Sequence, residues 1–182
     1  SVSVIDISGG IPALSQANVT TLLFSAYNSQ EATLIASGVR KLKATSTLSQ
    51  DFEPEYITIS ADSQKAWVTL QENNAVIEIN LATTTFTDIW ALGTKNVSLP
   101  GNGMDISDNN GHVLIANWPI QAFYMPDAVA NYTIGGTTYI VTANEGDEKE
   151  YTGFVERTTV GAAAYTLDPA IYPNASVLKQ SY

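Results

Sequence analysis

The sequence predicts an all-β protein built from β-propeller blades of four antiparallel strands each. A proline beside an acid opens two stretches, at Pro54 and Pro126. Each continues through an apolar strand and a turn into a second strand that reads Val-Thr-x-x-Glu, at residues 68–72 and 141–145. In addition, residues 53–92 hold four strand-length apolar segments separated by short turns. Repeated strand pairs are typical of propellers, whose blades have four strands.

The N-terminal residues 1–50 are expected to form a partial blade and one short helix. The first eight residues have the pattern of a strand and end at two glycines that favour a turn. A helix is predicted near residues 29–37. Asn28 and Glu31 have the spacing of a capping box at its start, and Gly38 is a typical C-terminal stop.

Residues 53–92 are predicted to form one complete blade. The connections between the apolar segments are rich in Asn, Asp, Ser and Thr, which favour turns. Because the segments are short and follow one another directly, each pair is expected to be antiparallel. The predicted strands are residues 56–60, 65–70, 75–81 and 85–92.

Residues 112–182 are predicted to form a further blade with long loops. The preceding residues 95–111 are rich in Gly, Asn, Asp and Pro, which excludes a core element there. A short apolar strand is predicted at residues 112–116. Residues 127–143 supply the second proline-led strand pair, which turns at Gly135-Gly136.

The 182 residues are therefore expected to be one portion of a propeller, with one complete blade and parts of two others. A ring normally needs at least four blades, so these residues are not expected to close a ring by themselves. Either a longer parent protein supplies the remaining blades, or neighbouring copies pair with the open sheet edges.

Composition excludes several classes of function. A net charge of −10 and a pI near 4.3 exclude a nucleic-acid-binding surface, which needs clustered basic residues. The absence of cysteine excludes disulfides and thiolate metal sites. No apolar run approaches the roughly 20 residues that cross a bilayer. His112 is the single histidine, and no nucleophile elbow, P-loop or histidine-based zinc motif occurs. No catalytic residue is therefore assigned.

Carboxylates stand where the two strand pairs begin and end, which suggests a cation site. Glu53 and Glu55 flank the first proline, and Asp127 follows the second. The first strand of a propeller blade lines the central channel, so these acids are predicted to meet at its mouth. Such oxygen ligands suit calcium or magnesium. The alternative is that they only cap strands and hydrate turns.

Two loops add further candidate ligands. In the acidic run after the second Val-Thr pair, Asn144, Glu145 and Asp147 surround a glycine that lets the backbone turn toward a cation. The long loop near residue 100 offers Asn102 and Asp105, although it lacks the ligand spacing of an EF-hand. Hydrated surface turns remain the alternative for both loops.

Four Asn-x-Ser/Thr sequons are candidate glycosylation sites in a secreted protein. Their asparagines are Asn18, Asn96, Asn131 and Asn174.

Several uncommon motifs follow one another along the chain. The first is Gln-Asp-Phe-Glu-Pro-Glu-Tyr and the last is Thr-Ala-Asn-Glu-Gly-Asp. They occupy residues 50–56, 68–75, 98–103, 116–119 and 142–147. Over about residues 34–151 the chain resembles the choice-of-anchor I family, which includes the mesenchyme-specific cell surface glycoproteins. The resemblance implies a secreted or surface-anchored β-propeller glycoprotein, in some animals associated with mineralised matrix. It supplies no catalytic residues. The family's Asn-Glu-Gly-Asp motif is often followed by an arginine, whereas Glu148-Lys149 stands here.

These observations favour one function and leave two alternatives open. The first is an extracellular or cell-surface glycoprotein module with a structural or matrix role, which binds calcium or another divalent cation, mineral or matrix polymers. The second is a calcium-dependent phosphoesterase-like propeller enzyme, although only two arginines, Arg40 and Arg157, are available to clamp a phosphate. The third is a filament or sheet subunit that self-associates through open sheet edges.

Overall fold

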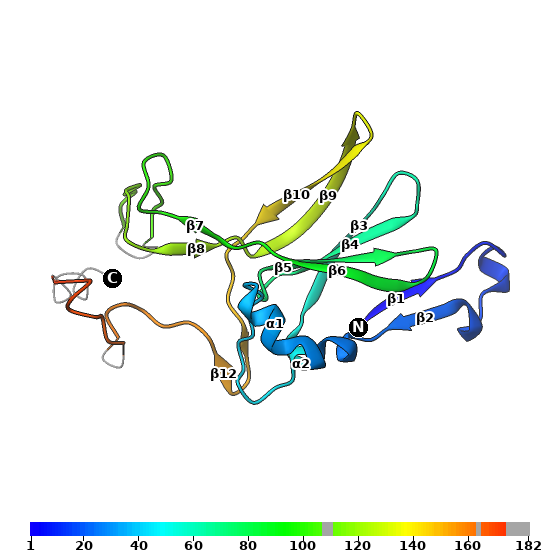
Figure 1. The fold of residues 1–182 in the computed structure, drawn as a ribbon, viewed down its shortest axis with the longest axis horizontal. Coiled ribbons are helices and arrows are strands. Elements are labelled where there is room, and N and C mark those ends of the chain that lie inside the picture. The colour runs from blue at the N-terminus through cyan, green and yellow to red at the C-terminus, as the bar shows by residue number, and fades with distance from the viewer. Residues whose placement is uncertain (107–110, 163–164, 174–182) are drawn as a thin grey trace. The chain divides into compact units, whose positions relative to one another are not determined.

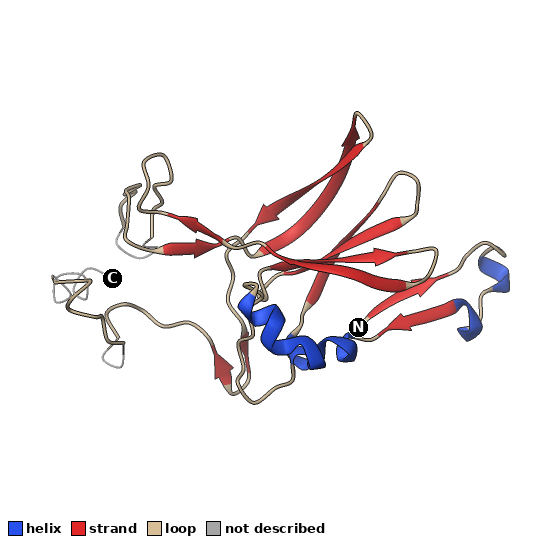
Figure 2. Ribbon diagram, viewed as in Figure 1, coloured by secondary structure: helices blue, strands red, loops and turns tan. Residues whose placement is uncertain are grey.

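A computed structural model describes residues 1–106, 111–162 and 165–173 (Figure 1). The chain divides into two compact units. The first unit joins Ser1–Thr94 to Phe123–Asp147, and the second joins Lys95–Ala122 to the residues from Glu148 onward. Most of the regular structure is antiparallel β (Figure 2), so the predicted all-β, partial propeller-like fold is confirmed.

The first unit contains the predicted four-stranded blade. Its antiparallel strands lie side by side in sequence order and run Pro54–Ile59 (β3), Lys65–Leu70 (β4), Ala75–Asn80 (β5) and Thr85–Ala91 (β6). Val68 pairs with Ile77, and Ile77 with Ile89, so these apolar side chains lie on one face. The four predicted strands are correct to within one or two residues at each end.

One face of this sheet packs against the N-terminal helical segment, below the sheet in Figure 1. That segment consists of a 3-10 helix at Phe24–Gln30, α1 at Glu31–Ala36 and α2 at Leu48–Asp51. Phe24 stacks on Phe86 of β6 at 5.0 Å between ring centroids and meets Phe52 edge to face at 5.4 Å. This aromatic cluster and the buried aliphatic side chains of β4 and β5 form the core.

The predicted helix exists, but its start differs from the prediction. Glu31 begins α1, and Gly38, with φ of +103°, stands just beyond its end, as expected for a stop. Asn28 does not form the predicted capping box. Its Oδ1 instead accepts a hydrogen bond from Ser49 N at 2.9 Å, which ties the 3-10 helix to α2, an element that was not predicted.

The second proline-led pair forms the predicted hairpin. Its strands are Pro126–Ile134 (β9) and Thr137–Asn144 (β10), and the turn is Gly135-Gly136. Both glycines have positive φ, 59° and 81°, which explains why glycine is needed in this tight turn. The hairpin lies against β3 and β4, on the sheet face away from the helices (Figure 1).

The N-terminal strand prediction is also confirmed. Val2–Ile5 (β1) pairs antiparallel with Val19–Leu22 (β2), whose position was not predicted. Two short 3-10 helices, Ile11–Ala13 and Gln16–Asn18, connect the two strands.

The described residues of the second unit contain little regular structure. Thr94–Asn96 (β7) and Gln121–Phe123 (β8) pair where the two units join in sequence, and Glu150–Tyr151 (β11) pairs with Phe154–Val155 (β12). The strand predicted at residues 112–116 is wrong. Those residues hold one isolated bridge, from Ala116 to Met104, because the loop folds on itself through side-chain bonds to backbone carbonyls.

Candidate functional site

Both proline-led hairpins of the first unit present carboxylates at the same end. In each hairpin, the proline pairs with the last residue of the second strand. Pro54 pairs with Leu70, and Pro126 pairs with Asn144. The ends of the two hairpins also lie close together, because the Glu55 carboxyl interacts with the charges of Asp127, Glu145 and Asp147. We call this group the acidic end; it comprises Glu53, Glu55, Glu72, Asp127, Glu145 and Asp147.

Hydrogen bonds hold the second hairpin's acids at the end of β4. Gln71 Nε2 donates to Glu145 Oε2 at 3.0 Å, and Thr69 Oγ1 donates to the backbone oxygen of Asp127 at 3.1 Å. Because each bond joins residues more than 50 positions apart in sequence, the convergence of the two hairpins is built into the tertiary fold.

The charges of the acidic end interact. Desolvation raises the pKa of the Glu55 carboxyl, and the like charges of Asp127, Glu145 and Asp147 raise it further. Desolvation is the larger cause. The acids that sequence analysis placed at the channel mouth and in the run after β10 are therefore close enough to oppose one another's ionisation.

Glu72 is the most unusual member of the acidic end. Its residue is only 8% exposed, and its Oε2 is the buried side-chain atom among the described residues that has no hydrogen-bond partner. Burial raises the pKa of Glu72 to about 7, and the neighbouring carboxylates Glu53 and Glu55 add to the increase. Near neutral pH this carboxyl is therefore divided between its protonated and ionised forms.

The turn that carries Glu72, residues 71–74, connects β4 to β5 and is buried throughout. Asn73 Nδ2 donates to Asp51 Oδ2 at 3.0 Å and to Arg40 O at 2.9 Å, while its Oδ1 accepts from Glu53 N at 3.2 Å. Asn73 thus fixes the backbone from which Glu53 projects.

Asn74 fixes the backbone at the start of the second hairpin. Its Oδ1 accepts hydrogen bonds from Tyr124 N and Met125 N, each at 3.0 Å, just before β9 begins. Its Nδ2 donates to Gly93 O at 2.8 Å. Asn74 has a φ of 51°, a left-handed conformation that asparagine tolerates better than most residues.

Arg40 packs behind this turn. Its Nη1 donates to Glu72 O at 3.0 Å, and its guanidinium lies 4.4 Å from the centre of the Phe123 ring. Burial lowers the pKa of Arg40, whereas the charges of Asp51 and Glu72 oppose that decrease. The arginine therefore supports the turn through its bond to the Glu72 backbone oxygen.

The acidic end has the donor chemistry of a calcium site without a finished coordination shell. Carboxylate oxygens are the ligands that calcium prefers. Among the residues that the structure describes, however, no group of three or more His, Cys, Asp or Glu side chains is arranged to hold an ion. A bound cation would have to draw these carboxylates together.

The remaining predicted ligands have other partners. Asn144 Oδ1, at the end of β10, accepts from Thr142 Oγ1 at 2.8 Å. Asn102 and Asp105 belong to the second unit, where Asn102 Nδ2 donates to Asn96 O at 2.9 Å and Asp105 Oδ2 accepts from Leu114 N at 2.9 Å. Both side chains therefore stabilise the loop that carries them.

Sequence analysis did not include Glu72 among the candidate ligands. The signal was present in the repeat, because Glu72 and Glu145 are the final residues of the two Val-Thr-x-x-Glu motifs. Glu145 was selected for its acidic neighbourhood, whereas Glu72 stands in a stretch that resembles an ordinary hydrated turn. Its importance arises from burial, which that local pattern does not reveal.

The sequons differ in how their asparagines are used. Asn18 Oδ1 accepts from Ser15 N and Asn96 Oδ1 accepts from Ser98 N, so both use their oxygens in local turns. Asn131 Nδ2, the atom that would carry a glycan, donates to Thr58 Oγ1 at 2.7 Å and Ile59 O at 2.9 Å. Asn174 lies outside the described residues.

We therefore expect Asn131 to stay unmodified, because a glycan on Nδ2 would remove one of the two hydrogen bonds that join β9 to β3. Glycopeptide mass spectrometry of the protein secreted from eukaryotic cells measures the occupancy of each sequon. Substitution of Asn18 or Asn96 by Gln should reduce the glycan mass if those sites are used, and Asn131→Gln should leave it unchanged. High occupancy at Asn131 would contradict this packing.

Comparison with protein families gave one finding that covers almost all of the chain. A family model of the choice-of-anchor I domain matches residues 1–181, nearly the whole chain. The chain belongs to the choice-of-anchor I domain family. No curated protein and no solved structure gave a match.

Membership confirms the resemblance seen in the sequence and identifies this choice-of-anchor I domain as a cell-surface-associated module. No helix in the described part of the chain is long and apolar enough to cross a membrane. The family description names no ligand.

Proposed function

We propose that this domain is an extracellular module with a structural role at the cell surface, and that its acidic end binds a divalent cation, preferentially calcium. The observation that carries the proposal is the buried, unpartnered Glu72 Oε2 among carboxylates from two separate hairpins. A net charge of −10 adds a long-range field that attracts cations.

Burial of the Glu72 carboxylate costs free energy. A buried ionised carboxylate with one unpartnered oxygen is unfavourable, and nearby like charges make it more so. Two events relieve this cost: Glu72 takes up a proton, or a cation binds beside it. At the pH of extracellular fluid the raised pKa of Glu72 leaves both events accessible.

Calcium fits the arrangement better than magnesium. Calcium accepts six to eight oxygen ligands in flexible geometry, whereas magnesium demands a near-ideal octahedron. The acids lie on separate segments and form no ready-made shell, so the ion must tolerate irregular positions. Glu72 and Glu145 would be the central ligands, because one is buried and the other is held by Gln71.

The test is calorimetric titration of the full chain with CaCl2, together with melting curves. Calcium at one hundred times its dissociation constant should raise the free energy of unfolding by about 2.7 kcal/mol. Glu72→Gln and Glu145→Gln should each abolish most of the heat. Asp88→Asn, which removes one exposed charge from β6, is the matched control and should bind normally. Absence of both heat and a melting shift in the unmodified protein would refute cation binding.

Binding should also release protons. Below about pH 7 a fraction of Glu72 is protonated, and calcium must displace that proton. The measured heat should therefore vary with the ionisation enthalpy of the buffer at pH 6.5 and lose that variation above pH 8. The Asp88→Asn control should show the same buffer dependence as the unmodified protein.

Self-association through an open sheet edge is a second candidate function. In the described residues, β10 pairs only with β9, and its Tyr139 and Val141 are about half exposed, at 46% and 51%. Light scattering over a concentration series tests this candidate. If this edge drives assembly, Val141→Lys should abolish it.

The phosphoesterase hypothesis has no comparable support. Arg157 pairs with Glu148 at 2.8 Å and Glu150 at 3.8 Å, and Arg40 packs on Phe123. Neither arrangement favours a phosphate clamp, so no enzymatic function is proposed.

A further inference from the structure

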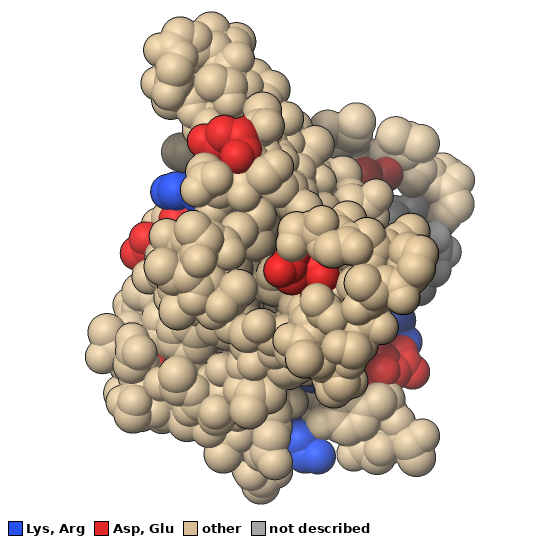
Figure 3. All heavy atoms as spheres, turned by 90° about the vertical axis from the view of Figure 1, so that its right-hand side faces the viewer, with Lys and Arg blue, Asp and Glu red and all other residues tan. Residues whose placement is uncertain are grey.

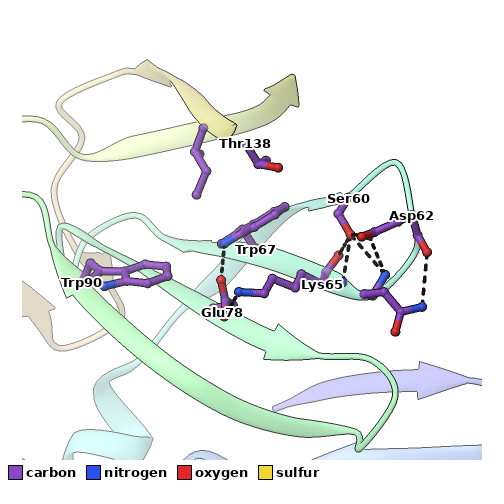
Figure 4. A pocket seen from close by; sticks show the side chains of 9 residues that line it. Ser60, Asp62, Lys65, Trp67, Glu78, Trp90 and Thr138 are labelled. Atoms are coloured by element: carbon purple, nitrogen blue, oxygen red, sulfur yellow. Dashed lines mark hydrogen bonds and ion pairs between the residues drawn. The ribbon is translucent and has the colours of Figure 1, made fainter. Parts of the chain in front are cut away.

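A second feature of the first unit lies away from the acidic end, near the turn between β3 and β4. A hollow of about 430 Å³ opens between the blade and the β9–β10 hairpin (Figure 4). Its size falls within the range of small-molecule sites. The residues that shape its chemistry are Asp62, Gln64, Lys65, Trp67, Glu78 and Trp90.

The floor of the hollow is a fixed hydrogen-bond network centred on Glu78. This side chain is buried, and its carboxylate accepts from Trp67 Nε1 at 3.0 Å, Lys65 Nζ at 3.0 Å and Thr87 Oγ1 at 2.9 Å. Burial raises the pKa of Glu78, but these donors outweigh that effect and hold it below its ordinary value. The network sets the positions of the Trp67 indole and the Lys65 ammonium before any ligand arrives.

Trp90 supplies an accessible aromatic surface. Val76 pairs with Trp90 and Glu78 with Trp67, so both indoles project from the same face of the sheet (Figure 4). Trp67 is 4% exposed, whereas Trp90 is 41% exposed. A half-exposed indole beside a pocket offers a flat apolar surface with polar groups around it.

Polar groups of the β3–β4 turn complete the rim. Asp62 Oδ1 accepts from Ser60 Oγ at 2.6 Å and from Gln64 N at 3.1 Å, which fixes the carboxylate in place. Ser63 holds this turn with a φ of 57°. The rim thus presents a carboxylate acceptor, the Gln64 amide and the Lys65 donor within one small space.

These features select one ligand class. Two carboxylates and one ammonium line the hollow, and the ammonium already pairs with Glu78, so anionic phosphates and sulfates are disfavoured. The Lys65 ammonium is paired with Glu78, and the remaining carboxylate, Asp62, lies on the exposed rim, where it can accept hydrogen bonds from a neutral ligand. A neutral molecule with one apolar face and many hydroxyl groups suits both the indole and the rim.

We propose that this hollow binds a neutral sugar ring, stacked on Trp90, with its hydroxyl groups hydrogen-bonded by Asp62, Gln64 and Lys65. The ring's C–H face replaces water on the indole, while the rim groups exchange water for hydroxyl partners. Recognition of a surface glycan by this site is independent of the cation site proposed above.

The experiment titrates the full chain with maltose and with N,N′-diacetylchitobiose in the presence of EDTA, followed by calorimetry and tryptophan fluorescence. EDTA separates the outcome from that of the calcium test. We expect at least one sugar to bind with a dissociation constant of about 1 mM. Trp90→Ala should weaken binding at least about tenfold, and Asp62→Asn should weaken it without changing the fold.

Trp118→Ala, in the second unit, is the matched control and should bind as the unmodified protein does. Circular dichroism of Trp90→Ala checks that the blade remains folded. The proposal is overturned if neither sugar binds, if Trp90→Ala binds sugar normally, or if choline binds at this site instead, which would assign it to a cation.

Discussion

Asp51→Ala is expected to lower the free energy of unfolding by about 3 to 5 kcal/mol, because it leaves several buried donors without an acceptor. The Asp51 carboxylate is 1% exposed and accepts from Leu42 N at 2.9 Å, Lys43 N at 3.0 Å and Asn73 Nδ2 at 3.0 Å.

Urea unfolding followed by circular dichroism measures this effect. Asp88→Ala makes the same chemical change at an exposed position of β6 and should alter the free energy of unfolding by less than about 0.5 kcal/mol. A double-mutant cycle with Asn73→Ala should give a coupling energy above about 1 kcal/mol. A loss of stability no larger than that of the control would show that the network contributes little.

Glu72→Gln is expected to act in the opposite direction and stabilise the protein at alkaline pH. In the folded state the pKa of Glu72 is raised from 4.5 to about 7. Between these two values the folded protein holds a proton that the unfolded chain has released. The contribution of Glu72 to stability therefore decreases as pH rises from about 4.5 to 7 and is lowest above that window.

Because the uncharged amide does not titrate, Glu72→Gln should exceed the unmodified protein by up to about 3 kcal/mol at pH 8 and lose that advantage near pH 4.5. The measurement is urea unfolding at pH 5, 6, 7 and 8 with EDTA present. Asp88→Asn should show no such pH-dependent difference. A difference that is constant across the pH range would contradict the raised pKa of Glu72.

Calcium should reduce the difference in free energy of unfolding between Glu72→Gln and the unmodified protein at pH 8. The ion stabilises the ionised carboxylate in the unmodified protein and has no equivalent ligand in Glu72→Gln. Comparing the two proteins at pH 8 with and without calcium therefore separates a cation site from a proton site. If the glutamine variant gains as much stability from calcium as the unmodified protein does, the acidic end is not the binding site.

The blade was predictable because its signals are local. Strands β3 to β6 have short apolar segments bounded by turn residues, and the Gly135-Gly136 turn requires a conformation that glycine adopts readily. The strand predicted at residues 112–116 failed although its composition is apolar. Val113 and Ile115 are strongly exposed, at 85% and 70%, so the apolar pattern there has no sheet to pack against.

The acidic end was predictable only in outline. The repeated motifs predict that the acids of the two hairpins lie close together, because the motifs mark equivalent ends of two equivalent strand pairs. Burial of the turn at residues 71–74 depends on Asp51 of α2 and on the chain near Met125, contacts that no local pattern contains. The sequon at Asn131 shows the same limit, because its bond to Thr58 joins residues 73 positions apart.

Charged side chains are sparse on the face shown in Figure 3, where most of the surface is uncharged. This sparseness agrees with a composition in which only 14% of residues are charged.

The fully buried turn between β4 and β5 has a practical consequence for protein engineering. A turn between two antiparallel strands is usually the first choice for inserting an affinity tag or a fluorescent label. Here Asn73 and Asn74 are inaccessible, so an insertion between them would separate three parts of the fold at once. The glycine pair at residues 135–136, with exposed side chains around it, is the safer place for such a fusion.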